Sequence, residues 1–206
     1  MRKGKLIAIE GSEGSGKSTV VLLLQEYFTK IGKSVVLFRE PGGTIAGEDI
    51  RSIILDRFYE ETISGRTEAY LYAASRSELV EKRVLPALEN YDYVLLDRYY
   101  YSSLVWQGEV RGLGRDFITT LNKPFMEQAK PDLAIYLHIS EQERLRRMAC
   151  RKEKQDRLDR EPLELLRRVD AAYKSLAEEF PEFQTVDAER SIYEVMETCR
   201  NLIEKL

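Results

Sequence analysis

The sequence contains very little histidine or cysteine. Its 206 residues include one His and two Cys. His138 lies in an apolar run, where we expect a structural strand residue, and a lone His excludes a metal site built from several His ligands. Cys150 and Cys199 are far apart in the sequence, and the chain contains no second pair of cysteines. This spacing excludes a zinc knuckle and favours free thiols in a reducing cytoplasm.

Long apolar runs are missing as well, since none approaches the ~18 residues of a membrane span. After a basic start, the first apolar stretch ends at Glu10, which is too soon for the apolar region of a signal peptide. The 32 Lys and Arg against 35 Asp and Glu give a net charge of −3, which argues against electrostatic binding of nucleic acid by the molecule as a whole. We therefore expect a cytoplasmic protein that binds neither membrane nor nucleic acid.

Short runs rich in Val, Ile and Leu alternate with helical patterns along the chain, as expected of strands that are buried on both faces. Strands are predicted at 5–10, 34–39, 93–97, 132–139 and 183–187. Helices are predicted at 18–30, 47–58, 66–89, 116–128, from 141 onward and at 191–206. Pro86 falls late in one helix and should kink or shorten it. The alternation predicts a single domain over 1–206, in the α/β class, with a parallel sheet of five strands between helical layers.

A glycine-rich loop follows the first expected strand. Residues 11–18 read Gly-Ser-Glu-Gly-Ser-Gly-Lys-Ser and match G-x-x-x-x-G-K-[ST] at every fixed position. Such a loop turns its backbone N–H groups toward phosphate oxygens, and the helix N-terminus adds partial positive charge. Lys17 should reach the β- and γ-phosphates of ATP, and Ser18 should bind Mg²⁺. The residues expected to contact the nucleotide are Gly11, Ser12, Glu13, Gly14, Ser15, Gly16, Lys17, Ser18 and Thr19.

The second Mg²⁺ ligand is expected at Asp97, which ends the strand 93–97, although a strand-terminal Asp is also a common turn starter. Loops of this kind occur in GTPase switches, motors and kinases. A switch needs the guanine-reading N-K-x-D, whereas residues 122–125 read Asn-Lys-Pro-Phe. The chain is short for a motor, so a small-molecule kinase remains.

Four motifs occur in a fixed order along the chain: 10–18, Arg39-Glu-Pro-Gly-Gly-Thr44, Tyr72-Ala-Ala-Ser-Arg76 and Asp97-Arg-Tyr99. In order and spacing the chain resembles the thymidylate kinase family, from about Lys5 to its end. The resemblance implies the three-layer P-loop kinase fold with a small lid. It implies transfer of the ATP γ-phosphoryl group to dTMP, which gives dTDP and ADP in dTTP biosynthesis. It further implies Mg²⁺ and a homodimer.

The same resemblance implies roles at the acceptor phosphate. Glu13 would face the 3′-hydroxyl of dTMP, and Arg98, Arg39 and Arg51 would gather around its phosphate. A guanidinium suits this role because it makes bidentate contacts and neutralises charge. Arg51 could instead be an exposed helix residue, and Arg39 could brace the loop after the second strand.

Base and sugar contacts are implied for a further group: Tyr72, Arg76, Ser103, Trp106 and Gln107. Tyr72 and Arg76 are four apart, so they share a helix face, from which the first would stack on thymine and the second would bind a base carbonyl. Tyr72 stands where Phe is more usual, and its hydroxyl needs a partner. Trp106 stands where relatives have Tyr or Phe beneath the sugar. The alternative is a buried core Trp.

A lid is implied at about 144–160. Residues 144–168 carry ten basic side chains, part of which an ordinary solvated helix face would explain. Some thymidylate kinases carry a catalytic arginine directly after the acid of the loop, where this chain has Gly14. The cation should then come from the lid, at Arg151 and Arg157, with Arg147 near the adenine.

Two alternatives remain open from the sequence. One is a kinase for another nucleotide or deoxynucleoside. The other is a regulatory protein that binds a nucleotide without turnover, although Lys17, Asp97 and Arg98 speak against it.

Overall fold

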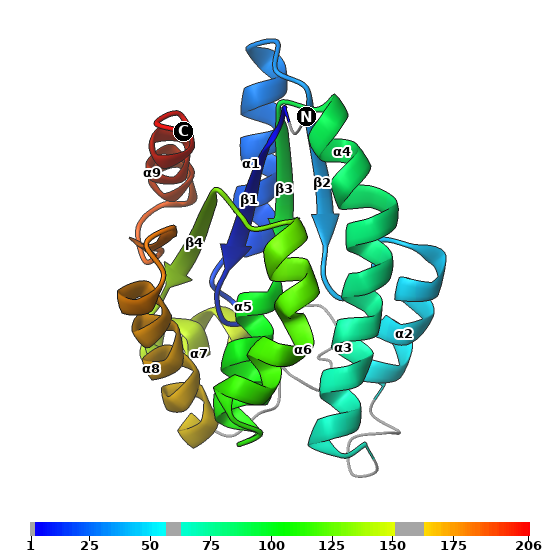
Figure 1. Ribbon diagram of the computed structural model, residues 1–206. Helices are drawn as coiled ribbons and strands as arrows, with labels where there is room; N and C mark the ends of the chain where they lie inside the picture. Colours follow the sequence, from blue (N-terminus) through cyan, green and yellow to red (C-terminus); the bar gives the residue numbers. More distant parts are fainter. Residues whose placement is uncertain (1–2, 57–62, 151–162) are drawn as a thin grey trace.

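The computed structural model describes residues 3–56, 63–150 and 163–206. Its sheet has five parallel strands in the order β2-β3-β1-β4-β5. The strands are β1 (Lys5–Glu10), β2 (Val35–Arg39), β3 (Tyr93–Asp97), β4 (Leu133–His138) and β5 (Phe183–Asp187). The strand arrowheads point to one end of the sheet (Figure 1). The predicted five-stranded parallel sheet is confirmed, and the loop that follows β1 lies at the carboxyl edge between β3 and β4.

Both faces of the sheet are buried, which explains the unbroken apolar strands. Along β1, Leu6 and Ala8 belong to one core cluster, and Ile7 and Ile9 belong to the other. Successive side chains of a strand point to opposite faces, so a strand that is apolar at every position requires cover on both.

Helices supply that cover on each side (Figure 1). One layer packs Val20, Val21 and Leu24 of α1 together with Val195 of α9. The other layer is formed largely by α3, α6 and α8. The helices are α1 (Lys17–Lys30), α2 (Ile45–Leu55), α3 (Gly65–Leu79), α4 (Leu85–Asn90), α5 (Tyr100–Ser103), α6 (Arg115–Gln128), α7 (Glu141–Cys150), α8 (Leu163–Glu179) and α9 (Ile192–Ile203). The three-layer α/β/α architecture is therefore confirmed.

The helix predicted at 66–89 continues past its proline. The π-helical turn η2 (Val80–Val84) joins α3 to α4, and Pro86 stands near the start of α4. Proline has no N–H to donate to the preceding turn, and the wider π turn lets the helix continue without that bond. A second π-helical turn, η3 (Leu104–Val110), follows α5. None of the described helices combines the length and the apolar character needed to cross a bilayer.

Candidate active site

The loop between β1 and α1 is shaped by glycine. Gly11 and Gly14 have φ values of 152° and 81°. A Cβ at Gly11 would lie 2.6 Å from Ser15 Oγ and 2.9 Å from Leu137 O, so no larger residue fits there. At the start of α1, Gly16 offers no side chain to cap the helix. The N–H groups of the first turn are therefore open to an anion.

Lys17 lies inside this loop and is buried. Its Nζ donates to Ser12 O at 2.8 Å. Burial, with Arg98 nearby, lowers the pKa of Lys17 to about 8, while Glu13 works in the opposite direction. Burial thus deprives the ammonium group of solvent, and an anion bound in the loop would stabilise its charge.

Ser18 and Asp97 meet where α1 begins and β3 ends. Ser18 Oγ donates to Asp97 Oδ2 at 2.6 Å. Both residues line the same cleft. Two hard oxygen donors beside a phosphate loop match the few protein ligands that Mg²⁺ takes when phosphate oxygens and waters complete its shell. The pair brought together by the fold is the pair predicted from the sequence.

Arg98 is turned toward the loop by an unusual backbone. Its φ is 71°, and it is the non-glycine residue with positive φ among those the structure describes. Its Nη2 forms an ion pair with Glu13 Oε1, and its Nη1 donates to Ser102 Oγ at 3.2 Å. Burial would raise the pKa of Glu13, but the charges of Arg98 and Lys17 outweigh it and the pKa is lowered. Glu13 is therefore a carboxylate, and its Oε2 is buried without a hydrogen bond to any described residue.

The segment after β2 brings two more cations to the cleft. Arg39 Nη2 donates to Glu48 Oε2 at 2.8 Å, and its side chain is 47% exposed. Arg51, on α2, donates from Nη1 to Pro41 O at 2.9 Å. Arg51 is half-buried and faces the cleft, so it is not an exposed helix residue. Arg39 lines the cleft, and its ion pair is with Glu48 on α2, whereas the alternative considered for it was bracing the loop after β2.

These residues enclose a cleft of about 360 Å³. Its lining includes the predicted residues Glu13, Gly14, Gly16, Lys17, Ser18, Thr19, Arg39, Arg51, Tyr72, Asp97 and Arg98. Ser12 and Ser15 are buried in the wall of the loop beneath it. One cavity thus joins a glycine-rich loop, a pair of oxygens that could hold a metal ion and three arginines.

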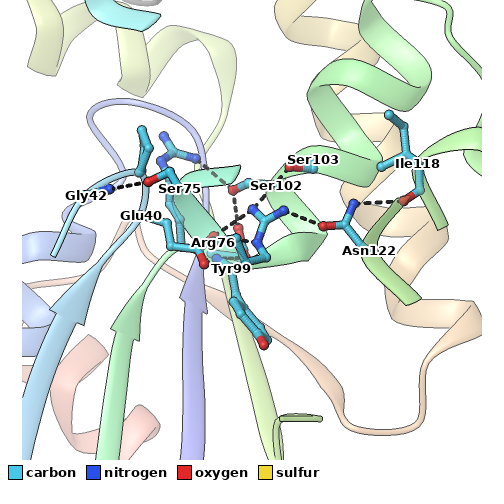
Figure 2. Close-up of polar contacts among 12 residues, drawn as sticks. Glu40, Gly42, Ser75, Arg76, Tyr99, Ser102, Ser103, Ile118 and Asn122 are labelled. Carbon is cyan, nitrogen blue, oxygen red and sulfur yellow. Dashed lines mark hydrogen bonds and ion pairs between the residues drawn. The ribbon is translucent and has the colours of Figure 1, made fainter. Parts of the chain in front are cut away.

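Tyr72 and Arg76 share a helix but have different surroundings. Tyr72 lines the cleft. Arg76 is 1% exposed and lies behind the cleft, where Nε and Nη2 donate to Glu40 Oε2 at 2.8 and 2.6 Å. Its Nη1 donates to Asn122 Oδ1 at 2.5 Å and its Nη2 to Ser103 Oγ at 3.2 Å. Figure 2 shows this guanidinium enclosed by its partners.

Burial raises the pKa of Glu40 to about 7, and Arg76 opposes the shift only in part. Glu40 Oε2 carries both bonds from Arg76, whereas Oε1 is buried without a hydrogen bond to a described residue. Asn122 is in turn fixed by its own bond to Ile118 O at 2.8 Å. The cluster around Arg76 therefore joins the loop after β2 to α3 and α6.

Trp106 and Gln107 lie in η3 and are buried. Trp106 is 4% exposed and packs in the main core, and its Nε1 finds no acceptor among the described residues. Gln107 Nε2 donates to Glu68 Oε1 at 2.7 Å, and Arg111 Nε approaches the same oxygen at 3.4 Å. These two predicted residues belong to the protein interior next to α3.

The lid is described only at its beginning. Arg147, on α7, donates to Glu143 Oε1 at 2.6 Å, to Gly14 O at 3.3 Å and to Ala188 O at 2.7 Å. It thus lies between the phosphate loop and the segment after β5. Arg151 and Arg157 lie outside the described residues.

The sequence did not identify a set of buried residues in and around the site: Glu10, Glu40, Glu68, Arg144, Asn122 and Tyr173. Of these, Glu40 lines the cleft itself. Glu10 and Glu40 were within motifs that the sequence displays, yet neither received a role. An acid that ends an otherwise apolar strand, as Glu10 does, is the signal that could have found one of them. The long-range partners of the others carry no local signal.

Comparison with known proteins shows which family the chain resembles. The thymidylate kinase family model matches residues 9–199. A thymidylate kinase of Caldicellulosiruptor saccharolyticus is 42% identical over 99% of this chain and 98% of its own length. That of Shouchella clausii is 40% identical over 100% and 97%, and that of Legionella pneumophila is 38% identical over 98% and 95%.

Proposed function

The chain belongs to the thymidylate kinase family, and from that membership we propose how its own residues phosphorylate dTMP. The activity is a phosphotransfer from ATP to dTMP, which yields ADP and dTDP. The assignment of this activity to the cleft rests on the groups that line it. A phosphate loop, the Ser18–Asp97 pair and the Glu13–Arg98 pair line one cavity, so a donor and an acceptor phosphate can meet there.

The donor end is the loop 11–18 with the start of α1. Backbone N–H groups of the loop and of the uncapped first turn bind the phosphates of ATP. Lys17 exchanges its bond to Ser12 O for the β- and γ-phosphates. Arg147 bridges Gly14 O and Ala188 O, so it borders the space next to the loop where the adenine would lie.

Mg²⁺ would be held by Ser18 Oγ and Asp97, whose oxygens already lie within hydrogen-bond distance. When bound, the ion neutralises charge on the β- and γ-phosphates. Ser18 and Asp97 come from α1 and β3, which are fixed in the core, so the two ligands are positioned before the nucleotide arrives.

The acceptor end carries the cations. Arg98, with Arg39 and Arg51, binds the phosphate of dTMP and neutralises charge as two anions approach. An oxygen of that phosphate attacks the γ-phosphorus, the bond to the β-phosphate oxygen breaks, and ADP leaves. No general base is needed because the attacking oxygen is already anionic. Glu13 Oε2, which receives no hydrogen bond from the described residues, would accept one from the sugar hydroxyl.

The base is read by α3. Tyr72 faces the cleft and would stack on thymine. Arginine has five N–H donors. The four hydrogen bonds that Arg76 makes to described residues leave one N–H on Nη1, which would bind a base carbonyl. Ser103 fixes that guanidinium, and Gln107 lies buried beyond it, held by Glu68. Trp106 shapes the pocket beneath the sugar from the core side.

The remaining features follow from family membership and are proposals. One domain spans 1–206, with a lid at about 144–160 that supplies Arg151 or Arg157 to the transferred group. Two copies form a homodimer. The free thiols of Cys150 and Cys199 fit a cytoplasmic setting.

The decisive experiment is a coupled assay of ADP formation from ATP with dTMP, dUMP, dCMP, dGMP and thymidine as acceptors. We expect rapid turnover with dTMP and slower or no turnover with the others. Preference for another acceptor would reassign the substrate, and ADP release that does not depend on any acceptor would refute the proposed transfer.

A further inference from the structure

Glu10 has no place in the cleft, yet it connects the residues around it. It is the last residue of β1 and its exposed fraction is 0%. Its carboxylate accepts three hydrogen bonds, from Tyr99, Ser102 and Tyr173. These donors belong to the turn after β3, to α5 and to α8, so one side chain joins segments that are far apart in the sequence.

The first of these bonds acts on the backbone of the Arg98 turn. Tyr99 N donates to Glu10 Oε1 at 2.8 Å, and Arg98 N donates to Ile9 O at 3.0 Å. The end of β1 thereby holds two successive N–H groups of that turn. Arg98 has a φ of 71°, a conformation that is unfavourable for a residue with a Cβ and that persists only when the surroundings enforce it. Glu10 supplies part of that enforcement.

The second bond acts on the guanidinium. Ser102 Oγ donates to Glu10 Oε2 at 2.5 Å. A hydroxyl has a single proton, so this bond leaves its lone pairs to accept from Arg98 Nη1 at 3.2 Å. Glu10 therefore orients both the backbone and, through Ser102, the side chain of Arg98. Tyr99 and Ser102 lie beside the Arg76 cluster (Figure 2).

The third bond reaches α8, the helix that begins at Leu163. Tyr173 OH donates to Glu10 Oε2 at 3.1 Å and lies 3.1 Å from Ser102 Oγ. Its ring stacks on Tyr136 with centroids 4.4 Å apart. The neighbouring Tyr136 OH donates elsewhere, to Asp170 Oδ1 at 3.0 Å. These two stacked tyrosines differ in whether their hydroxyl reaches Glu10.

A buried carboxylate costs desolvation free energy that a purely structural position does not require. Burial raises the pKa of Glu10, which means that the charged form is disfavoured where it lies, although Ser102 and Arg98 offset part of the effect. A neutral side chain of the same size would avoid that desolvation. The acid is therefore better explained by what it does for Arg98 than by what it does for the fold.

We propose that Glu10 is a positioning residue for phosphoryl transfer, which aims Arg98 at the acceptor phosphate and ties that aim to α8 through Tyr173. The inference rests on the proposed role of Arg98. It predicts that the effect of Glu10 on the rate depends on the presence of Arg98.

The test is a double-mutant cycle on the full chain, with kcat and KM measured for ATP and dTMP. Misplacing a reacting group by about 1 Å can cost ~10²-fold in rate. We therefore expect Glu10→Gln to lower kcat by roughly 10- to 100-fold with KM for ATP within about twofold. In the Arg98→Ala background the same change should alter kcat by less than about twofold, because the interacting pair is already broken. An equal loss in both backgrounds would overturn the inference alone. Full activity of Arg98→Ala would overturn the acceptor site and the inference together.

Two further variants keep the inference testable if Glu10→Gln does not fold. Tyr173→Phe deletes the hydroxyl that bonds Glu10 and keeps the ring, and we expect kcat to fall about three- to tenfold. Tyr136→Phe is the matched control, since it deletes the other hydroxyl of the stack, and its kcat should stay within about twofold of wild type. Thermal unfolding of each variant checks the fold. Equal rates for the two Phe variants would contradict the link to α8.

Discussion

The two ends of the cleft are built in different ways. The proposed donor end is a run of consecutive residues, 11–18, in which the backbone and Lys17 would bind the phosphates. The acceptor end is assembled from side chains of separate elements. There Arg76 of α3 bonds Glu40 after β2 and Asn122 of α6. The difference suggests that changes at the donor end remove chemistry and leave stability, whereas changes at the acceptor end affect both.

The largest expected effect is at the donor end. Lys17→Ala should lower kcat by about 10³-fold, because a charge that acts on the transferred phosphoryl group is lost. The loop shape depends on glycines and backbone, and Lys17 is itself a buried charge, so the free energy of unfolding should change by less than about 1 kcal/mol. Steady-state kinetics and urea denaturation measure the two quantities. A large loss of stability with little loss of kcat would contradict the view that the donor end acts on the reaction and not on stability.

Arg76→Ala should do the reverse. It would leave buried Glu40 without its cation, so the acid would have to stay charged and unpaired or take up a proton, and we expect the free energy of unfolding at pH 8 to fall by about 3 kcal/mol. The double variant Glu40→Gln/Arg76→Met removes both charges and should lose less stability than Arg76→Ala. If urea denaturation shows the same loss of unfolding free energy for both variants, the unpaired charge of Glu40 is not the cause of the loss.

Glu40 should also give the acceptor end a pH dependence. Its pKa is about 7 in the folded protein against an ordinary value of 4.5, so the folded state keeps a proton that the unfolded chain has released. The contribution of Glu40 to the free energy of unfolding is therefore full below pH 4.5 and falls as the pH rises to 7.

Glu40→Gln should remove this part of the pH profile, a difference of up to about 3 kcal/mol. Denaturation of both proteins from pH 5 to 8 provides the measurement. Parallel profiles would show that Glu40 titrates normally.

A smaller effect on stability is expected at Trp106, which packs in the hydrophobic core. Trp106→Phe should lower the free energy of unfolding by about 1–2 kcal/mol, as the smaller ring leaves space. If Trp106 shapes the sugar pocket, the substitution should also lower the ratio of kcat/KM for dTMP to kcat/KM for its ribonucleotide analogue. An unchanged ratio would show that Trp106 acts only in the core.

The smallest effect on stability is expected at Arg39, which is 47% exposed. Arg39→Gln breaks an exposed pair with Glu48 and should change the free energy of unfolding by less than about 1 kcal/mol. The activity with dTMP should still fall severalfold, because one cation of the acceptor site is gone. Activity equal to wild type would restrict Arg39 to bracing α2.

The same comparison explains what the sequence could predict. The strands and the donor loop were predictable, since each depends on neighbours along the chain, and the alternation of strands with helices indicated the parallel sheet. The pairing of Ser18 with Asp97 was predictable because Asp97 ends β3 and the loop before Ser18 follows β1, and the ends of these neighbouring strands meet at one edge of the sheet. Helix α2 was predicted two residues late at 47 and begins at Ile45, where Thr44 caps it by accepting from Gly47 N.

The partners of the acceptor end were not predictable. Arg76 was expected to face the base, and nothing nearby in sequence indicates that Glu40, Ser103 and Asn122 would enclose it. Those contacts span 27 to 46 residues and depend on how helices pack. Glu10 was visible as an acid at the end of an apolar strand, but its donors come from as far as Tyr173.

One measurement tests the division between the two ends most directly: the affinity for dTMP, by titration calorimetry, of wild type, Lys17→Ala and Arg76→Ala under conditions where all three are folded. The account predicts that Lys17→Ala binds dTMP about as tightly as wild type while it fails to turn over. It predicts that Arg76→Ala binds dTMP at least about tenfold more weakly. Equal affinity in all three proteins, or a loss confined to Lys17→Ala, would contradict it.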